Sequence, residues 1–189
     1  PELEALANPK SPKEFIIAGI QVTGTKYRDA ALLLSISGLT VGDKLVIPGG
    51  DNISKAIQNL WKQNLFSDVE IYYTKIEGNN IFIEINVTER PSLAGFTFKG
   101  VKKSESEDLD KKTGLVKGRV ITENMKRTAV ENIEKYYVEK GFRGAKVVIE
   151  EKNDPALPNS QNLVFNISKG NKVRINQLSF YGNEEVEEL

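Results

Sequence analysis

The segment Ile20-Gln21-Val22-Thr23-Gly24 ends in a glycine, and the same pattern occurs twice more along the chain. It matches Phe96-Thr97-Phe98-Lys99-Gly100 and, near the end, Leu178-Ser179-Phe180-Tyr181-Gly182. Apolar residues that alternate with polar ones and precede a glycine predict a strand that ends at that glycine. Gly24 and Gly100 are separated by 76 positions (100 − 24), which indicates an internal repeat of that length.

Other landmarks share this offset. They are Gly38-Leu39 with Gly114-Leu115, Gly42 with Gly118, and Phe66 with Phe142. A set of apolar residues at helical spacing is shifted in the same way, namely Ile53, Ile57, Leu60 and Trp61 against Ala129, Ile133, Tyr136 and Tyr137. Because the third copy stops after its first strand, we expect the sequence to be part of a longer chain.

Each whole unit is predicted to contain a strand, two helices and a two-stranded hairpin. In the first unit we expect strands at 15–23, 69–76 and 81–88 and helices at 28–37 and 52–64. In the second we expect strands at 94–99, 145–151 and 162–168 and helices at 105–112 and 123–140. The prediction is an α+β fold of tandem β-α-α-β-β units, each with two helices packed on one face of a three-stranded mixed sheet.

The expected organisation follows from these elements. Residues 1–13 form a flexible N-terminal segment, 14–91 the first unit, 92–172 the second unit, and 173–189 the truncated first strand of a third. The longest apolar run, from Ala30 to Leu34, is far shorter than the roughly 20 residues of a membrane helix.

The amino-acid composition excludes many kinds of catalytic and metal-binding site. The chain has 189 residues, no cysteine and no histidine, which excludes cysteine nucleophiles, histidine bases and nearly all zinc or haem sites. Lys+Arg and Asp+Glu are both 26, so no net charge attracts nucleic acid. The carboxylates form no recognisable acid/base pair. We therefore expect no enzyme, no catalytic residue, no metal site and no cofactor.

Two glycine motifs have alternative interpretations. The stretch from Gly38 to Lys44 resembles a phosphate-binding loop, but the glycine spacing is short and Asp43 stands where lysine is needed, so a helix-to-helix turn is favoured. Gly141-Phe142-Arg143-Gly144 has the form of a KH-type nucleic-acid loop, but it lies between a helix and a strand, which favours a helix cap. A tandem RNA-binding protein stays an alternative, with Trp61, Tyr136 and Tyr137 as stacking residues rather than core.

The repeated pattern resembles the polypeptide-transport-associated (POTRA) domains of BamA-type outer-membrane protein assembly factors. The resemblance is carried by the strands that end at Gly24, Gly100 and Gly182, by the element order, and by the helix ends at Leu65-Phe66 and Gly141-Phe142. The first unit departs from the family at Asn64, where glycine is common. Two-partner secretion transporters and a cell-division protein also use such units and stay alternatives.

The resemblance implies a non-catalytic function. The chain would be a periplasmic arm that receives unfolded outer-membrane proteins and docks accessory lipoproteins for barrel insertion. A C-terminal membrane barrel, expected in the full-length protein, would tether it to the outer membrane. The competing interpretation is a spacer that docks only folded partners.

Unfolded clients could bind by adding a strand to a sheet edge, since edge strands offer unpaired N–H and C=O groups. With the last strand of each hairpin central, strands 69–76 and 145–151 are predicted to lie at edges. The predicted client- and partner-binding residues are Val69, Glu70, Ile71, Tyr72, Tyr73, Thr74, Lys75, Ala145, Lys146, Val147, Val148, Ile149 and Glu150.

Overall fold

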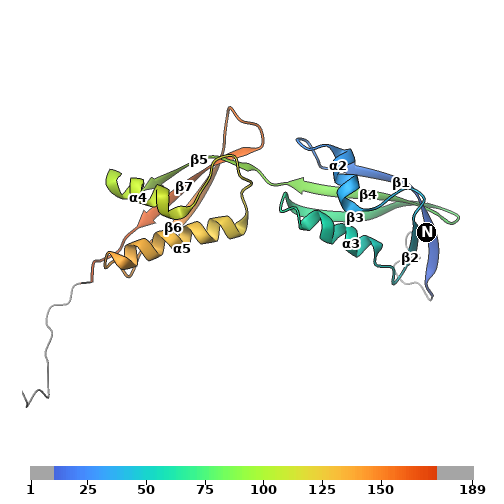
Figure 1. Cartoon of the computed structure of the whole chain (residues 1–189), viewed down its shortest axis with the longest axis horizontal. Helices are drawn as coiled ribbons and strands as arrows, with labels where there is room; N and C mark the ends of the chain where they lie inside the picture. Colours follow the sequence, from blue (N-terminus) through green and yellow to red (C-terminus); the bar gives the residue numbers. More distant parts are fainter. Residues whose placement is uncertain (1–10, 174–189) are drawn as a thin grey trace, which may run out of the picture. The chain divides into compact units, whose positions relative to one another are not determined.

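The computed structural model describes residues 11–173 and contains two repeats of strands and helices (Figure 1). The first repeat comprises β1 (Lys13–Thr23), α2 (Ala30–Ser37), β2 (Lys44–Ile47), α3 (Asn52–Trp61), β3 (Phe66–Glu77) and β4 (Asn80–Glu89). The second comprises β5 (Ser92–Lys99), α4 (Lys103–Thr113), α5 (Glu123–Glu139), β6 (Lys146–Asn153) and β7 (Ser160–Ser168). The predicted strand of a third unit lies outside the described residues, as does most of the predicted N-terminal segment.

Each repeat forms one sheet whose central position is taken by its last strand. The strand order is β2-β1-β4-β3 in the first sheet and β5-β7-β6 in the second. In the first sheet β4 pairs parallel with β1 and antiparallel with β3. The α+β fold of tandem helix-and-sheet units is therefore confirmed. The chain divides into two compact units with the main boundary after Ala94, and the segments Gly118–Thr122 and Asn153–Gln161 group with the first unit. The predicted domain limits stay predictions.

The first sheet has four strands, so the prediction of three was wrong for this repeat. The additional strand β2 pairs antiparallel with the start of β1, from Lys13 opposite Ile47 to Ile16 opposite Lys44. In the second repeat only the last of these pairs is kept, as an isolated bridge between Ser92 and Val120. The chain before Ser92 is the connection from β4. Pro91 in this connection has no N–H to donate, although its carbonyl accepts a hydrogen bond from the Ile121 N–H at 2.8 Å.

The core of each repeat lies between its sheet and its helices. In the first repeat β4 buries alternate residues, and the helices contribute buried aliphatic side chains: Ile81, Ile83, Ile85 and Val87 with Leu33, Ala56 and Leu60. The second core is built from Leu93, Leu109, Ala129, Ile133, Tyr136, Tyr137, Leu163 and Phe165. The side chains on one face of β4 are thus removed from water, as the sequence alternation predicts, whereas β7 buries the consecutive residues Leu163, Val164 and Phe165.

Trp61 departs from the expected core. It is 38% exposed, whereas its counterpart Tyr137 in the second repeat is fully buried. The difference follows from helix length, because α3 ends at Trp61 while α5 continues past Tyr137 to Glu139. The sequence predicted that α3 would extend to Asn64, but Asn64 has a positive φ of 56° and lies outside the helix.

Gly24 and Gly100 explain why a glycine ends the first strand of each repeat. Their φ angles are +78° and +81°, a region that side chains disfavour. A Cβ atom would lie 2.0 Å from the carbonyl oxygen of Val87 at Gly24, and 2.1 Å from that of Ile167 at Gly100. Each glycine therefore lets the chain turn directly against the backbone of the central strand.

The two glycine motifs have structural roles. Gly38 closes α2 in the left-handed conformation, and the Gly42 N–H donates to the Ile17 carbonyl at 2.8 Å, so it is not free to hold a phosphate. The equivalent bond from Gly118 to Leu93 is also 2.8 Å. Gly141 follows α5, and its N–H donates to the Val138 carbonyl at 2.9 Å, which makes it the expected helix cap.

Candidate functional site

The two strands predicted to bind clients are the outermost strands of their sheets. β3 is the last strand of the first sheet, and β6 is the last strand of the second (Figure 1). Val69 to Lys75 lie within β3 and Lys146 to Glu150 within β6, whereas Ala145 precedes β6 by one residue. Within the part of the chain that the structure describes, each strand has a sheet neighbour on one side only, so its other side offers backbone N–H and C=O groups.

The side chains of β3 alternate between the core and solvent. Val69, Ile71 and Tyr73 pack against the first core, whereas Glu70 and Tyr72 are exposed. The exposed Tyr72 hydroxyl donates a hydrogen bond to the Glu70 carboxylate, and this bond raises the pKa of the tyrosine. The backbone edge and one row of side chains are therefore available together.

Two irregularities limit the regular part of β3. The register with β4 skips one residue between Phe66 and Asp68 and another between Tyr73 and Lys75. Bulges of this kind bend a strand and end the regular spacing of its hydrogen-bonding groups. The stretch from Asp68 to Tyr73 is consequently the part of this edge best suited to pair with another strand.

The β6 edge carries both half-buried and exposed side chains. Val147 and Ile149 are half-buried, whereas Lys146 and Glu150 are exposed and Val148 is 66% exposed. An apolar side chain with this exposure on an edge strand adds apolar contact area to the backbone groups. The second repeat therefore presents an edge with both polar and apolar binding elements.

A groove runs between β6 and α5, which sequence reasoning did not find. Its apolar lining comes from Val130, Val147, Val148 and Ile149, and its rim carries Glu123, Lys126, Arg127, Glu131 and Glu151. The spacing of Val130 on a helix and Val147 on a strand is visible in the sequence. Their proximity is not, because it depends on how α5 packs on the sheet.

Lys126 is the best-fixed charge of this groove. Its ammonium group lies 2.7 Å from a carboxylate oxygen of Glu123 and 2.6 Å from one of Glu151, and its side chain is only 16% exposed. Burial disfavours the charged lysine, but the hydrogen bonds to the two carboxylates outweigh it and raise the pKa of Lys126. This ion pair fastens α5 to the edge strand and fixes the width of the groove at that point.

Among the described residues there is no group of histidine, cysteine, aspartate or glutamate side chains that could hold a metal ion. The carboxylates beside β6 are engaged with lysine, as Glu151 is with Lys126 and Glu150 with Lys152 at 3.1 Å. Within residues 11–173, no helix combines the length and the apolar character needed to cross a membrane.

Known proteins with sequences similar to this chain are consistent with the fold and the internal repeat described above. Residues 91–170 match the POTRA family, described as surface antigen variable number repeat. The outer membrane protein assembly factor BamA of Nitratidesulfovibrio vulgaris is 27% identical over 174 residues, which cover 91% of this chain. The chain spans 21% of the length of that relative.

Two solved structures share the fold at low sequence identity. The N-terminal domain of Omp85 from Thermosynechococcus elongatus has a TM-score of 0.55 at 16% identity, covering 84% of this chain and 64% of that one. BamA POTRA domains 3–5 of Haemophilus influenzae have a TM-score of 0.50 at 16% identity, covering 95% and 76% respectively. The resemblance inferred from the sequence is thereby confirmed: residues 91–170 match the POTRA family, and the chain has the tandem POTRA fold of BamA and Omp85 proteins.

Proposed function

We propose that this chain is a non-catalytic periplasmic arm that receives unfolded outer-membrane proteins by adding their strands to the edges of β3 and β6. The observation that carries the proposal is the position of both strands at the free side of their sheets. The similarity to an outer membrane protein assembly factor supports a setting at the outer membrane. The proposal also includes a tether to that membrane and docking of accessory lipoproteins.

Strand addition suits a receptor for many different clients. The main-chain groups of an edge strand form hydrogen bonds with any extended segment, whatever its side chains. Apolar contacts then select segments with alternating apolar residues, which is the pattern of strands destined for a barrel. The exposed Val148 and the groove that contains Val130 and Val147 supply such contacts beside β6.

Of the two edges, β6 is expected to bind more strongly. Its edge is bordered by the apolar groove against α5, whereas the regular part of β3 exposes Glu70 and Tyr72. Weak sites on the two repeats could still act together on one long client, since linked sites raise the effective concentration of the second contact.

The test is a titration of the isotope-labelled chain with a short peptide that has the alternating sequence of a barrel strand, followed by backbone amide shifts in NMR. We expect the shifts to concentrate on Val69 to Lys75 and on Lys146 to Glu150. Absence of shifts at millimolar peptide would contradict strand addition and favour the spacer that docks folded partners.

Proline variants make the test specific to the backbone. Successive residues of a strand direct their N–H groups to opposite sides, so either Val148→Pro or Ile149→Pro removes an N–H from the free edge. The variant of this pair that keeps the fold should lose peptide binding. Val148→Thr is the matched control, because it changes the exposed side chain and keeps the N–H. Peptide affinity unchanged in both proline variants would rule out the β6 edge.

A further inference from the structure

The second repeat has another free edge, on the side of its sheet opposite β6. β5 is the outer strand there, and among residues 11–173 its only further pairing is the isolated bridge between Ser92 and Val120 at its start. The stretch from Gly95 to Lys99 therefore has its partner strand, β7, on one side only. Its other side lies next to α4, and a groove separates the two.

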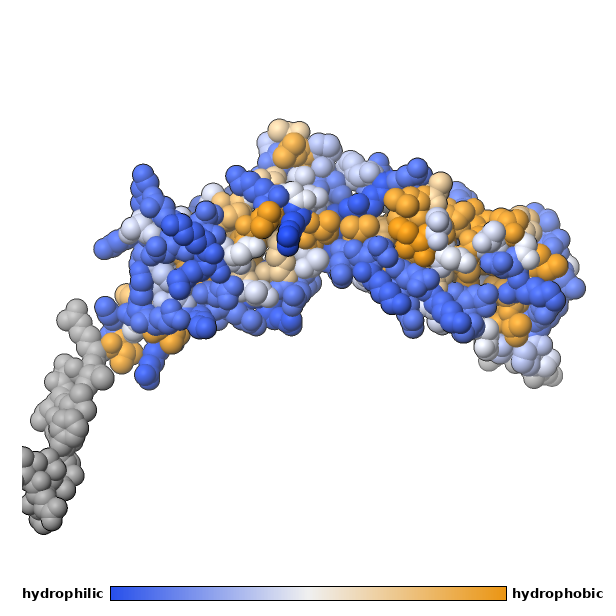
Figure 2. Space-filling view, in the orientation of Figure 1, coloured by the Kyte–Doolittle hydropathy of each residue, from blue (hydrophilic) through white to orange (hydrophobic). Residues whose placement is uncertain are grey.

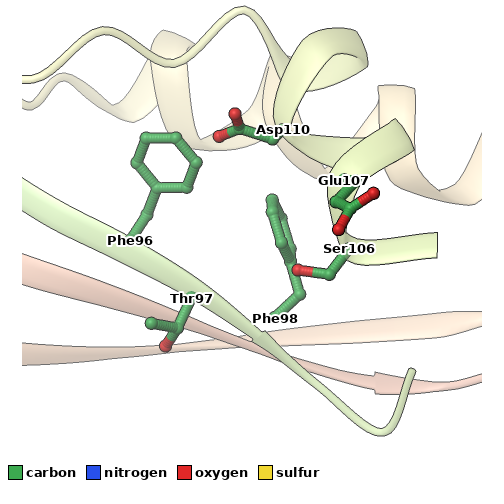
Figure 3. A pocket seen from close by; sticks show the side chains of 6 residues that line it. All are labelled: Phe96, Thr97, Phe98, Ser106, Glu107 and Asp110. Carbon is green, nitrogen blue, oxygen red and sulfur yellow. The ribbon is translucent and has the colours of Figure 1, made fainter. Parts of the chain in front are cut away.

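Two aromatic side chains form one wall of this groove. Phe96 and Phe98 are half-buried and rise from β5 toward the helix, whereas Thr97 points away (Figure 3). Their rings contact edge-to-face with centroids 5.8 Å apart, and the Phe98 ring lies 5.5 Å from that of the fully buried Phe165. The apolar wall is thus an extension of the core, held in place from below, and it faces solvent at the sheet edge.

The opposite wall is polar and acidic. It consists of Ser106, Glu107 and Asp110 on α4, and no basic residue lines the groove (Figure 3). Within residues 11–173, the carboxylates of Glu107 and Asp110 form no hydrogen bond or ion pair, so their charges are available to a ligand.

The other two carboxylates of α4 are engaged on the far side of the helix. Glu105 pairs with Lys169 at 2.6 Å, and Asp108 accepts a hydrogen bond from the Tyr136 hydroxyl at 2.8 Å and lies 3.7 Å from Lys140. The acidic residues of α4 therefore divide into a set that fastens the helix to its repeat and a set that faces the groove.

The first repeat shows that this chemistry is not required by the fold. The positions equivalent to the groove residues, 76 places earlier, are uncharged: Ile20, Gln21, Val22, Ala30, Ala31 and Leu34. Among them Ile20, Val22 and Leu34 pack against the first core. Since the equivalent helix and strand of the first repeat pack without carboxylates, the acidic wall of the second repeat is not needed to hold α4 on the sheet.

We propose that the β5–α4 groove binds an extended peptide segment that carries a large apolar residue and a lysine or arginine two positions apart. A strand added to the edge of β5 turns every second side chain toward α4, at intervals of about 7 Å. The apolar side chain of that row would pack on Phe96 and Phe98, and the cation would reach Glu107 and Asp110. This inference concerns a different edge from the proposed client sites on β3 and β6 and adds a preference for positive charge.

The probe is a short synthetic peptide that alternates threonine with leucine and lysine, compared with the same peptide carrying glutamate in place of lysine. Both are titrated into the isotope-labelled full chain at low salt. We expect the lysine peptide to shift the amides of Gly95 to Gly100 and Ser106 to Asp110, and to bind about tenfold more tightly than the glutamate peptide, as two screened charge pairs would give.

Two double variants distinguish the effect of charge in the β5–α4 groove from the effect of the overall charge of the chain. Glu107→Gln with Asp110→Asn should weaken the lysine peptide about threefold, because the neutral side chains remove the attraction without adding the repulsion that the glutamate peptide meets. Glu123→Gln with Glu131→Gln removes the same charge from the β6–α5 groove and should leave binding at β5 unchanged. Phe96→Ala should weaken both peptides, because it removes apolar contact that does not depend on charge.

Three results would overturn the inference: equal affinity for the two peptides, equal loss in the two double variants, or shifts confined to β3 and β6. The last result would still support the proposed client sites. Conversely, a proline variant of β6 that abolishes barrel-strand binding but leaves the β5 shifts intact would establish the two edges as separate sites.

Discussion

α2 and α4 occupy the same place in their repeats but present opposite surfaces. Each buries a leucine and ends at a glycine in the left-handed conformation, with Leu33 and Gly38 in one and Leu109 and Gly114 in the other. α2 contains no charged residue and leaves Leu32 57% exposed, whereas α4 is rich in lysine, glutamate and aspartate. Figure 2 shows apolar surface where α2 lies and hydrophilic surface where α4 lies. The buried leucine and the terminal glycine fix the helix, and its outer face can vary with what it binds.

Trp61 and Tyr137 are aromatic residues at equivalent positions, and replacing them should give the largest difference in unfolding free energy between the two repeats. Tyr137→Ala removes a fully buried ring and is expected to cost about 4 kcal/mol of unfolding free energy. Trp61→Ala, at a site 38% exposed, should cost about 1–2 kcal/mol. Urea denaturation followed by far-UV circular dichroism measures both. Equal losses would show that α3 continues past Trp61 in solution.

The strand-ending glycines test whether both repeats depend on the same backbone approach. Gly24→Ala and Gly100→Ala should each cost about 3 kcal/mol, since the new Cβ meets a carbonyl oxygen and φ is positive. Gly42→Ala is the control, because φ is also positive there but nothing lies within 4 Å, and about 1 kcal/mol is expected. Fluorescence of Trp61, the single tryptophan, follows Gly24→Ala. If Gly24→Ala lowers the unfolding free energy no more than Gly42→Ala does, the predicted clash of the new Cβ with the carbonyl oxygen is refuted.

The helix starts differ in how a carboxylate stabilises them. Asp29 caps α2 by accepting a hydrogen bond from the Ala31 N–H at 2.8 Å. Glu105, at the equivalent position, accepts from the Lys102 N–H at 2.8 Å and from Lys169 at 2.6 Å. Burial opposes the charge of Glu105 most strongly, but the hydrogen bonds from Lys169 and the Lys102 N–H, together with the positive charges of Lys169 and Lys140, outweigh it. The pKa of this carboxyl therefore lies below its usual 4.5.

Glu105→Gln should therefore cost about 1–2 kcal/mol at neutral pH. Because the folded pKa lies below the unfolded one, this contribution is present above about pH 4.5 and is lost as the pH falls through the folded value. Unfolding free energies between pH 7 and pH 3 should accordingly fall less steeply for Glu105→Gln than for the unaltered chain. Asp29→Asn serves as the matched variant in the first repeat. Parallel pH curves for Glu105→Gln and the unaltered chain would exclude the ion pair as the cause.

The exposed face of α2 should accept charged residues like those of α4 without loss of stability. Leu32→Glu changes an exposed side chain and is expected to alter the unfolding free energy by less than about 0.5 kcal/mol. Thermal denaturation measures this change in unfolding free energy. Ser35→Glu, at a second exposed position of α2, is measured for comparison. A loss of several kcal/mol at Leu32 would mean that its exposed face is part of the core after all.

The sequence predicted the repeat because its landmarks are local. A glycine at a positive φ, such as Gly38 or Gly114, is required by the backbone itself and leaves a mark at a fixed place in the chain. The alternation in β4 likewise identifies a strand with one buried face. These features do not depend on distant residues, and for that reason the element order and the central position of the last strand agree with the structure.

Features that depend on packing between elements were missed. β2 spans only Lys44–Ile47, and such a short apolar run is a strand only because β1 extends far enough to pair with it. The end of α3 was placed three residues too late, which put Trp61 in the core. Neither groove of the second repeat was predicted, since the approach of Glu107 to Phe96, like that of Val130 to Val147, is set by the tertiary fold.

The central position of the last strand gives each repeat a fixed order of assembly. β4 lies between β1 and β3, and β7 lies between β5 and β6. The two strands of each pair therefore have no common neighbour until the final strand of the repeat has been made. In a chain delivered from its N-terminus, β3 remains without its sheet until β4 emerges, and β6 waits for β7 in the same way. The edges proposed to receive clients are thus created in the last step of each repeat, and no partly delivered repeat can hold a client on a finished sheet.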